Sequence, residues 1–413
     1  SILALDADTG AYRWHFQATP RDQWDYTATQ PIMLAELPLG ESGAPRRVVM
    51  QAPKNGFFYV LDAEDGEYIS GDAFAQMSWA TGLDDNGRPI EVPAARNLAE
   101  DYIVSPGPLG AHNWHPMSYN PNTGLVYIPT NDIPFLLSLP GEEGPTKSFW
   151  NIGYRADADP GWVLERPAGM VEYVREEFIK GALLAWDPVK REPAWAVPYP
   201  MPFNGGTLST ESGLVFQGTK NEELIAYDAK TGDRLWSHPL VGAPGAAPMT
   251  YEVDGEQYLT VLAGWGSSAA MNSSLALDTV APPEVGRVIT FKIGGDEELP
   301  APMMDTVVRQ PRIAEFGDKA MLEHGMRIFA ANCQFCHGTF ALSSGAVPDL
   351  RWSAMTASEE AWDAVVREGA LSKNGMRSFA DLLSKEDTDA VRAYVVKQAW
   401  VAVALGEAEA PTE

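Results

Sequence analysis

The sequence has few cysteines, few basic residues and no long apolar run. Its 413 residues include two cysteines, and 30 Lys and Arg stand against 56 Asp and Glu, a formal net charge of −26. Two cysteines are too few for a disulfide scaffold, and the acidic balance argues against a nucleic-acid-binding protein, which needs a basic face. Because no run reaches about eighteen apolar residues, we expect no transmembrane segment.

The start of the chain also lacks an initiator methionine, a signal sequence and a polar lead-in. Ser1 is followed at once by an apolar stretch, Ile2–Leu5, that runs into a turn. We therefore expect this sequence to be the C-terminal part of a longer polypeptide, with any signal peptide outside it.

The only two cysteines are Cys333 and Cys336, and His337 follows the second one. This C-x-x-C-H spacing is typical of c-type haem attachment, in which two thiols add to the haem vinyl groups and the imidazole binds the iron. A thioredoxin-like site would need a βαβ context, and a structural zinc site would need two further ligands. The motif predicts one covalent haem c. Because bacteria make that attachment outside the cytoplasm, we expect a periplasmic protein.

The residues around this motif predict helices. Gly325, Phe329 and Cys333 follow one another at intervals of four and so share one face of a helix. A final helix is expected from Asp387 to Val401, because Ser384 precedes it and apolar residues form a stripe along it. Helices on both sides of a haem motif indicate a small all-α domain.

Met376 is the expected second axial ligand of the haem iron. It lies downstream of the motif at the distance usual in small cytochromes, and His–Met ligation is an electron-transfer arrangement with a raised potential. Met326 is assigned to the core, and Met355 ranks well below Met376 as a ligand. Residues 313–405 resemble a class I cytochrome c. In that family a proline carbonyl orients the haem histidine, and Pro348 matches that proline.

An internal repeat occupies the part of the chain before the haem domain. The segment Ala4–Trp14 recurs as Ala226–Trp236, each a strand, an Asp-x-x-Thr-Gly turn and a second strand. Weaker copies lie at residues 60–66, 119–124 and 185–195. Such repetition predicts a β-propeller in which Trp14 and Trp236 are apolar plugs between neighbouring sheets. A β-sandwich with chance similarity of turns is the alternative.

These patterns divide the chain into three parts. Residues 1–292 are expected to form a partial propeller, residues 293–312 a linker, and residues 313–413 a cytochrome c domain with an acidic tail. The expected fold is therefore an all-β propeller followed by an all-α domain.

Five short segments of the propeller part follow one another in an informative order: Pro20–Tyr26, Gln51–Asp62, Gly110–Ser118, Asn204–Leu208 and Ala246–Tyr251. Together with a C-terminal cytochrome c, they resemble the quinohaemoprotein alcohol dehydrogenases. The resemblance implies an eight-bladed propeller, whose N-terminal blades are missing here. It also implies pyrroloquinoline quinone (PQQ) and Ca²⁺ near the propeller axis, and oxidation of primary or secondary alcohols to aldehydes or ketones.

The resemblance assigns roles to five residues. Asp25 matches the catalytic base of the family, and a carboxylate beside a dry quinone can take the alcohol proton while the hydride passes to the quinone. Lys54 matches a residue that hydrogen-bonds the quinone oxygens, where a cation stabilises growing negative charge. Asn113 and Trp114 match PQQ contacts, and Ala247 matches a position whose backbone meets the quinone.

Several features depart from the family pattern. Phe203 stands where relatives often carry Trp next to the quinone. Thr27 is neutral where relatives that use lanthanides carry an extra Asp, which favours Ca²⁺. The vicinal disulfide, the Glu and Asn calcium ligands and the stacking Trp of the family are expected upstream of this chain, so no calcium ligand is assigned. His112 and His115 are interpreted as structural residues, because two imidazoles without a third ligand make a poor metal site.

The expected function is that of a soluble periplasmic alcohol dehydrogenase. Electrons would pass from PQQ through haem c to an external acceptor, either a cytochrome c or a cupredoxin. Two alternatives remain open: the catalytic subunit of a membrane-associated alcohol dehydrogenase complex, and a non-catalytic electron-transfer propeller whose quinone site has decayed. The retained Asp25, Lys54 and Asn113 favour an enzyme over the non-catalytic alternative.

Overall fold

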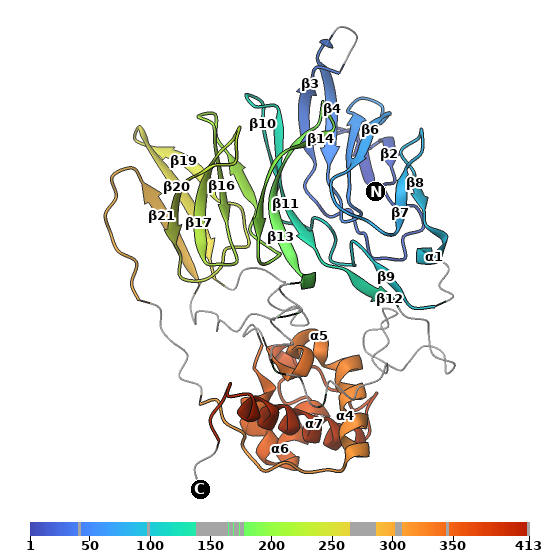
Figure 1. The fold of residues 1–413 in the computed structure, drawn as a ribbon, viewed down its shortest axis with the longest axis vertical. Helices are drawn as coiled ribbons and strands as arrows, with labels where there is room; N and C mark the ends of the chain where they lie inside the picture. The colour runs from blue at the N-terminus through green and yellow to red at the C-terminus, as the bar shows by residue number, and fades with distance from the viewer. Residues whose placement is uncertain are drawn as a thin grey trace. The chain divides into compact units, whose positions relative to one another are not determined.

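The computed structural model divides the chain into two compact units (Figure 1). It describes residues 1–39, 43–96, 100–137, 177–264, 286–301, 308–343 and 347–410, together with residues 164, 168 and 173. The first unit comprises Ser1–Leu137, Val174–Ser267 and Val285–Pro302, and the second comprises Ser138–Tyr173, Ser268–Glu284 and Met303–Glu413.

The elements described in the first unit are short strands and the helical turn α1. The strands of its first half are β1 (Ile2–Leu5), β2 (Tyr12–Phe16), β3 (Met33–Leu37), β4 (Arg46–Gln51), β5 (Phe57–Asp62), β6 (Tyr68–Ala73), β7 (Ala80–Leu83), β8 (Pro89–Glu91), β9 (Tyr102–Val104), β10 (Ser118–Asn120), β11 (Leu125–Asp132) and β12 (Phe135–Leu137), with α1 (Pro93–Arg96). Those of its second half are β13 (Lys180–Asp187), β14 (Glu192–Tyr199), β15 (Thr207–Ser209), β16 (Leu214–Gly218), β17 (Glu223–Asp228), β18 (Arg234–Pro239), β19 (Met249–Val253), β20 (Glu256–Ala263) and β21 (Arg287–Lys292).

Neighbouring strands pair antiparallel into separate sheets. Three sheets have four strands each, in the orders β3-β4-β5-β6, β10-β11-β13-β14 and β15-β16-β17-β18. A three-stranded sheet, β19-β20-β21, and the two-stranded pairs β1-β2, β7-β8 and β9-β12 complete the described set. In Figure 1 the larger sheets stand side by side, from β3–β6 in blue to β19 and β20 in yellow and β21 in orange. This is the arrangement of propeller blades.

The repeated sequence forms a repeated hairpin turn. After β17, the Asp228 carboxylate oxygen Oδ1 accepts hydrogen bonds from the backbone N–H groups of Lys230 and Thr231, at 2.8 and 3.0 Å. Gly232 then closes the turn with a φ of 76°, and its N–H donates to the Asp228 carbonyl oxygen at 2.9 Å. An Asp carboxylate at the first position and a glycine in the left-handed region are what this turn requires.

Tryptophans of one sheet cover turn glycines of the next. A Cβ on Gly66 would lie 2.6 Å from the ring of Trp14, and a Cβ on Gly232 would lie 2.6 Å from that of Trp195. Trp14 is buried, so its prediction as an apolar plug is confirmed. The same prediction is wrong for Trp236, which is 40% exposed. The Trp236 ring packs against Phe291 of β21. The turn that would cover this ring should follow β21, but the residues there are Ile293-Gly294-Gly295 and not an Asp-x-x-Thr-Gly turn.

The second unit is helical over its described residues. Its helices are α4 (Lys319–Asn332), α5 (Gln334–His337), α6 (Glu359–Val366) and α7 (Lys385–Ala404), with 3₁₀ turns η4 (Thr339–Ala341), η5 (Leu350–Trp352), η6 (Ala354–Ala357) and η7 (Ser372–Asn374). α4 and α7 cross at Gly325, where a Cβ would lie 1.9 Å from the Ala390 carbonyl oxygen. Only glycine permits this approach. α7 extends beyond the predicted Asp387–Val401 because Ser384 caps it at Lys385 in a capping box.

Candidate functional site

The loop between β4 and β5 is buried, although connecting loops usually lie on the surface. Every residue from 51 to 60 is buried. The side chain of Asn55 replaces solvent there: its Nδ2 donates to the Tyr59 hydroxyl at 3.0 Å and its Oδ1 accepts the N–H of Phe57 at 3.1 Å. Because a buried loop must satisfy its polar groups inside the protein, these bonds fix its conformation and with it the position of Lys54.

Lys54 reaches from this loop to Asp25. Its side chain is 9% exposed and passes along Gly110, where a Cβ would lie 2.4 Å from Lys54 Cγ. The ammonium Nζ donates to the Asp25 carbonyl oxygen at 2.9 Å and lies 3.3 Å from the carboxylate Oδ2. The structure therefore brings together the predicted base and the predicted quinone-binding cation.

Asp25 stands between two buried aromatic residues. Trp24 and Tyr26 both pack on Trp79, with ring centroids 4.9 and 5.1 Å apart, and the Tyr26 hydroxyl donates to the Pro106 carbonyl oxygen at 2.5 Å. Asp25 itself has a φ of 62° and a side chain that is 63% exposed. A non-glycine residue in the left-handed region is uncommon and is often found at functional sites. The Asp25 carboxylate is therefore accessible, and the aromatic residues on either side of it hold its backbone rigidly.

His112 and His115 hold the next segment in place. His112 is fully buried, and its ring nitrogens lie 2.7 Å from the Ala52 carbonyl oxygen and 2.8 Å from that of His115. Burial lowers the pKa of His112 and lowers the pKa of His115 to about 3, so that both rings are neutral at pH 7. Within the described part of the chain, the buried Nε2 of His115 has no hydrogen-bond partner. Such an atom is a polar position that a bound group can satisfy.

Asn113 and Trp114 lie between these histidines. The Asn113 amide donates to the Leu109 carbonyl oxygen at 2.8 Å and accepts the N–H of Trp114 at 2.8 Å. The Trp114 indole is 38% exposed and stacks on the His115 ring, with 4.3 Å between centroids and 19° between planes. A partly exposed ring supported from below is a preformed surface for a planar ligand.

Ala247 meets the same segment through Gly206. A Cβ on Gly206 would lie 2.6 Å from Pro116 Cδ and 3.0 Å from Ala247 Cβ, so the three residues are in contact. Phe203, three residues before Gly206, has a φ of 57° and donates its N–H to the Asn131 side chain at 2.8 Å. Segments that lie far apart in the sequence therefore converge near Trp114.

These residues fit PQQ, a planar quinone with three carboxylates. Lys54 offers a buried cation, Trp114 an aromatic surface and His115 an unpaired ring nitrogen. Across the described ranges, no three His, Cys, Asp or Glu side chains are placed to hold a metal ion.

Two residues that contribute to this site, Arg96 and Gly110, are not among those predicted from the sequence. Arg96 covers Trp24, with its guanidinium 4.5 Å from the ring centre, and donates to the Arg21 carbonyl oxygen at 2.9 Å. It thus supports the loop of Asp25 from a distant part of the chain, and no local pattern indicates this. The sequence does draw attention to Gly110, because this glycine begins the segment that contains Asn113 and Trp114.

The predicted haem-attachment residues lie where α4 ends and α5 begins. Cys333 separates the two helices, and Cys336 and His337 are in α5. The two thiols are not joined in a disulfide, and burial raises the pKa of Cys333 to about 12 and also raises that of Cys336. A thiol–disulfide catalyst needs a thiol of low pKa. His337 Nδ1 lies 3.1 Å from the Pro348 carbonyl oxygen, which leaves Nε2 for iron, so the residues fit a c-type haem.

The position of Met376 also suits a haem ligand. It is half-buried and packs against the core of the helical unit, which includes Phe329 and Leu383. Met326 is buried in the same core on α4, and Met355 is 37% exposed on η6. These positions favour Met376 over both rivals.

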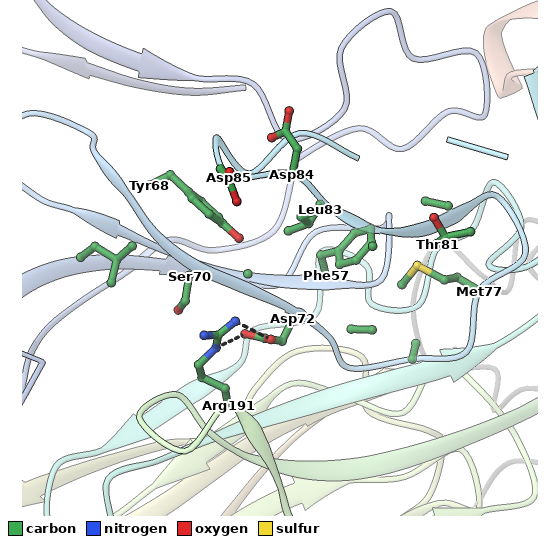
Figure 2. A pocket seen from close by; sticks show the side chains of 16 residues that line it. Phe57, Tyr68, Ser70, Asp72, Met77, Thr81, Leu83, Asp84, Asp85 and Arg191 are labelled. Atoms are coloured by element: carbon green, nitrogen blue, oxygen red, sulfur yellow. Dashed lines mark hydrogen bonds and ion pairs between the residues drawn. The ribbon is translucent and has the colours of Figure 1, made fainter. Parts of the chain in front are cut away.

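A separate groove of about 920 Å³ lies on the first unit between β6 and β7 (Figure 2). Tyr68, Leu83 and Asp84 line it, and Arg191 closes one side through its ion pair with Asp72 at 2.7 Å. None of the residues predicted for the site lines this groove. It is therefore not the place of the expected chemistry.

Comparisons with known proteins find matches for both parts of the chain. The glucose/ethanol/alcohol dehydrogenase β-propeller domain matches residues 1–71 and 181–259, and the cytochrome c oxidase, cbb3-type, subunit III family matches residues 320–395. The quinohaemoprotein alcohol dehydrogenase ADH IIB of Pseudomonas putida is 42% identical over 97% of this chain and 56% of its own length. The chain is a homologue of the quinohaemoprotein alcohol dehydrogenases. The predicted β-propeller followed by a cytochrome c domain is confirmed.

Two further members of the family extend the comparison. The solved structure of ADH-IIG from Pseudomonas putida matches with a TM-score of 0.84 and 41% identity, over 97% of this chain and 58% of that one. The 1-butanol dehydrogenase (cytochrome c) of Thauera butanivorans is 38% identical, over 96% of this chain and 56% of its own length. The chain thus spans about half the length of these relatives. Among its described helices, none is long and apolar enough to cross a membrane.

Proposed function

We propose that this chain forms the C-terminal part of a PQQ-dependent alcohol dehydrogenase that passes electrons out through a covalent haem c. The contact between Lys54 and Asp25 is the observation that supports it most, because it joins a buried cation to an accessible carboxylate. In domain terms, residues 1–292 would be the propeller part, 293–312 the linker and 313–413 the cytochrome c part with its tail.

In the proposed reaction, Asp25 removes the hydroxyl proton of the alcohol at a carboxylate oxygen. Its exposed side chain is open to a small substrate, and Lys54 holds its backbone and carboxylate in one orientation. The Lys54 ammonium offers positive charge to oxygens that become negative, and its burial strengthens that effect. When bound, PQQ supplies the acceptor for the hydride, and Ca²⁺ supplies a Lewis acid for a quinone carbonyl.

In the second unit, Cys333 and Cys336 would hold the haem, and His337 and Met376 would bind its iron. Haem c supplies a one-electron carrier, so the two electrons of each alcohol leave in separate steps. We propose a soluble cytochrome c or a cupredoxin as the external acceptor and the periplasm as the compartment. Short primary alcohols are the first substrates to test, since one relative is named a 1-butanol dehydrogenase.

Activity of the full-length, haem-loaded protein tests this proposal. With PQQ and Ca²⁺ added, it should reduce an artificial dye with 1-butanol, and Asp25→Asn should abolish turnover without changing the haem spectrum. If no short alcohol reduced the dye, the enzyme proposal would be wrong, and the non-catalytic electron-transfer alternative would stand in its place.

A further inference from the structure

Arg351 and Asp349 form an ion pair directly after the proline that contacts the haem histidine. The guanidinium Nε donates to Asp349 Oδ1 at 3.0 Å, and Nη2 donates to Oδ2 at 2.6 Å. The backbone N–H of Arg351 donates to the same carboxylate at 3.1 Å. Two parallel N–H···O bonds make this a bidentate pair, which is geometrically well defined.

This pair is unusually buried. The Arg351 side chain is 6% exposed and that of Asp349 is 20% exposed. Other ion pairs described in the same unit are more open to water, such as Lys397 with Glu315, whose side chains are 25% and 45% exposed. Taking two charges out of water is costly and does not in itself stabilise a fold. A buried pair beside a ligand-orienting residue therefore points to a role at that residue.

The C-terminal residues shield this pair from solvent. The Arg351 guanidinium lies 4.9 Å from the centre of the Trp352 ring, and Glu407 approaches its Nη1 at 3.7 Å. Trp352 packs in turn with three alanines of α7 and the tail, Ala399, Ala402 and Ala408. Glu407 and Ala408 of the acidic tail thus help to shield Arg351 and Trp352 from solvent.

The pair is linked to the haem site through one carbonyl group. His337 Nδ1 lies 3.1 Å from the Pro348 carbonyl oxygen, and that carbonyl belongs to the peptide that joins Pro348 to Asp349. Because Asp349 is held by three hydrogen bonds from Arg351, the orientation of this peptide is fixed from its C-terminal side. Arg351 therefore acts on His337 without touching it.

We propose that Arg351 is a positioning residue for the haem, which neutralises Asp349, holds the Pro348 carbonyl against His337 and so keeps the reduction potential of the iron high. An unpaired carboxylate at this place would favour the ferric state, because oxidised iron has one more positive charge. The inference rests on the proposed haem site. It does not depend on alcohol oxidation, since a haem potential is measured without alcohol or quinone.

The test is the haem midpoint potential of the full-length, haem-loaded protein, measured by spectroelectrochemistry at pH 8. Arg351→Met should raise the ratio of oxidised to reduced haem at a fixed potential about tenfold, which is about 59 mV for a one-electron couple. Asp349→Asn should lower that ratio, because it leaves the cation unpaired. The double variant should return toward the wild-type value.

Opposite signs in the two single variants separate charge from structural damage, because a loosened haem site would lower the potential in both. Lys397→Met removes the cation of the more exposed pair with Glu315, at 3.2 Å, and should leave the potential unchanged. Arg351→Lys keeps the charge and should restore most of the potential. The proposal is overturned if both single variants shift the potential the same way, or if Arg351→Met shifts it no more than Lys397→Met.

Discussion

The Lys54 ammonium donates to the Asp25 carbonyl oxygen at 2.9 Å and lies 3.3 Å from the carboxylate of the same residue. One side chain thus restrains both the backbone and the side chain of Asp25, whose φ of 62° is uncommon for a residue with a Cβ. The two partners differ in exposure, with Lys54 at 9% and Asp25 at 63%. A buried cation beside an accessible carboxylate suits an electrostatic partner and a general base.

Replacing Lys54 by Met should remove this restraint and the positive charge while keeping a similar volume. We expect kcat/KM for 1-butanol to fall about 100-fold, close to the effect of losing one donor to a developing oxyanion. Lys190→Met is the matched control, because Lys190 forms an exposed ion pair with Asp187 at 3.2 Å. Steady-state kinetics of the full-length enzyme would refute the role of Lys54 if both variants behaved like the wild type.

The substitution Gly66→Ala should destabilise the propeller through the Trp14 contact. Gly66 has a φ of 77°, and a Cβ would lie 2.6 Å from the Trp14 ring. We expect a loss of about 2–4 kcal/mol in the free energy of unfolding, from backbone strain and a displaced ring. Gly10→Ala should cost only about 1 kcal/mol, because Gly10 has a φ of 70° and, apart from its chain neighbours, no described residue has an atom within 4 Å of its Cβ position. The free energy of unfolding of each variant would be measured by urea titration. If Gly66→Ala and Gly10→Ala lost the same amount, the contact with the Trp14 ring would contribute nothing to the loss.

The buried histidines predict a loss of stability in acid. Burial lowers the pKa of His112 and lowers that of His115 to about 3. Between about pH 6.5, the unfolded value, and the folded pKa, the unfolded chain binds more protons, so the free energy of unfolding falls as the pH falls. For one group the slope is about 1.4 kcal/mol per pH unit.

His115→Phe tests this prediction, because it keeps a ring under Trp114 and removes the titrating group. The difference in thermal midpoint between pH 7 and pH 5 should become smaller than in the wild type. His15→Phe, at an exposed position, serves as the control and should leave that difference unchanged. If the thermal midpoint of His115→Phe differed between pH 7 and pH 5 as much as that of the wild type, His115 would not contribute to the loss of stability in acid.

Met376→Ala should convert the haem to a weakly ligated state with a lower potential, because a thioether ligand raises the potential of haem iron. Absorption spectroscopy of the haem-loaded protein would show loss of the low-spin spectrum. Met355→Ala should leave the spectrum unchanged, since Met355 lies exposed on η6. The reverse outcome would assign the second ligand to Met355.

Local patterns were sufficient for the turns and for the haem motif. The Asp228 carboxylate and Gly232 build the hairpin because their residue types suit its backbone. His337 follows the two thiols at a spacing that the attachment chemistry requires. In both cases the decisive contacts lie within a few residues of each other, and the sequence shows them directly.

Contacts between distant segments could not be read in the same way. The packing of Gly110 on Lys54, the stacking of Arg96 on Trp24 and the ion pair of Arg351 with Glu407 depend on how the elements pack. The wrong prediction for Trp236 has a related cause, since the repeat implies a neighbouring turn that does not follow β21. Periodicity and spacing describe one element at a time and contain no information on such neighbours.

We propose that electrons pass from the site at Asp25 to the haem bound by His337. Reduction of the haem by alcohol tests this proposal most directly. The full-length protein, loaded with haem, PQQ and Ca²⁺, would be mixed anaerobically with 1-butanol in a stopped-flow spectrometer. We predict haem reduction in the wild type and a rate about 10³-fold lower in Asp25→Asn, with dithionite reducing both haems alike. Reduction of the Asp25→Asn haem by 1-butanol at the wild-type rate would contradict the account.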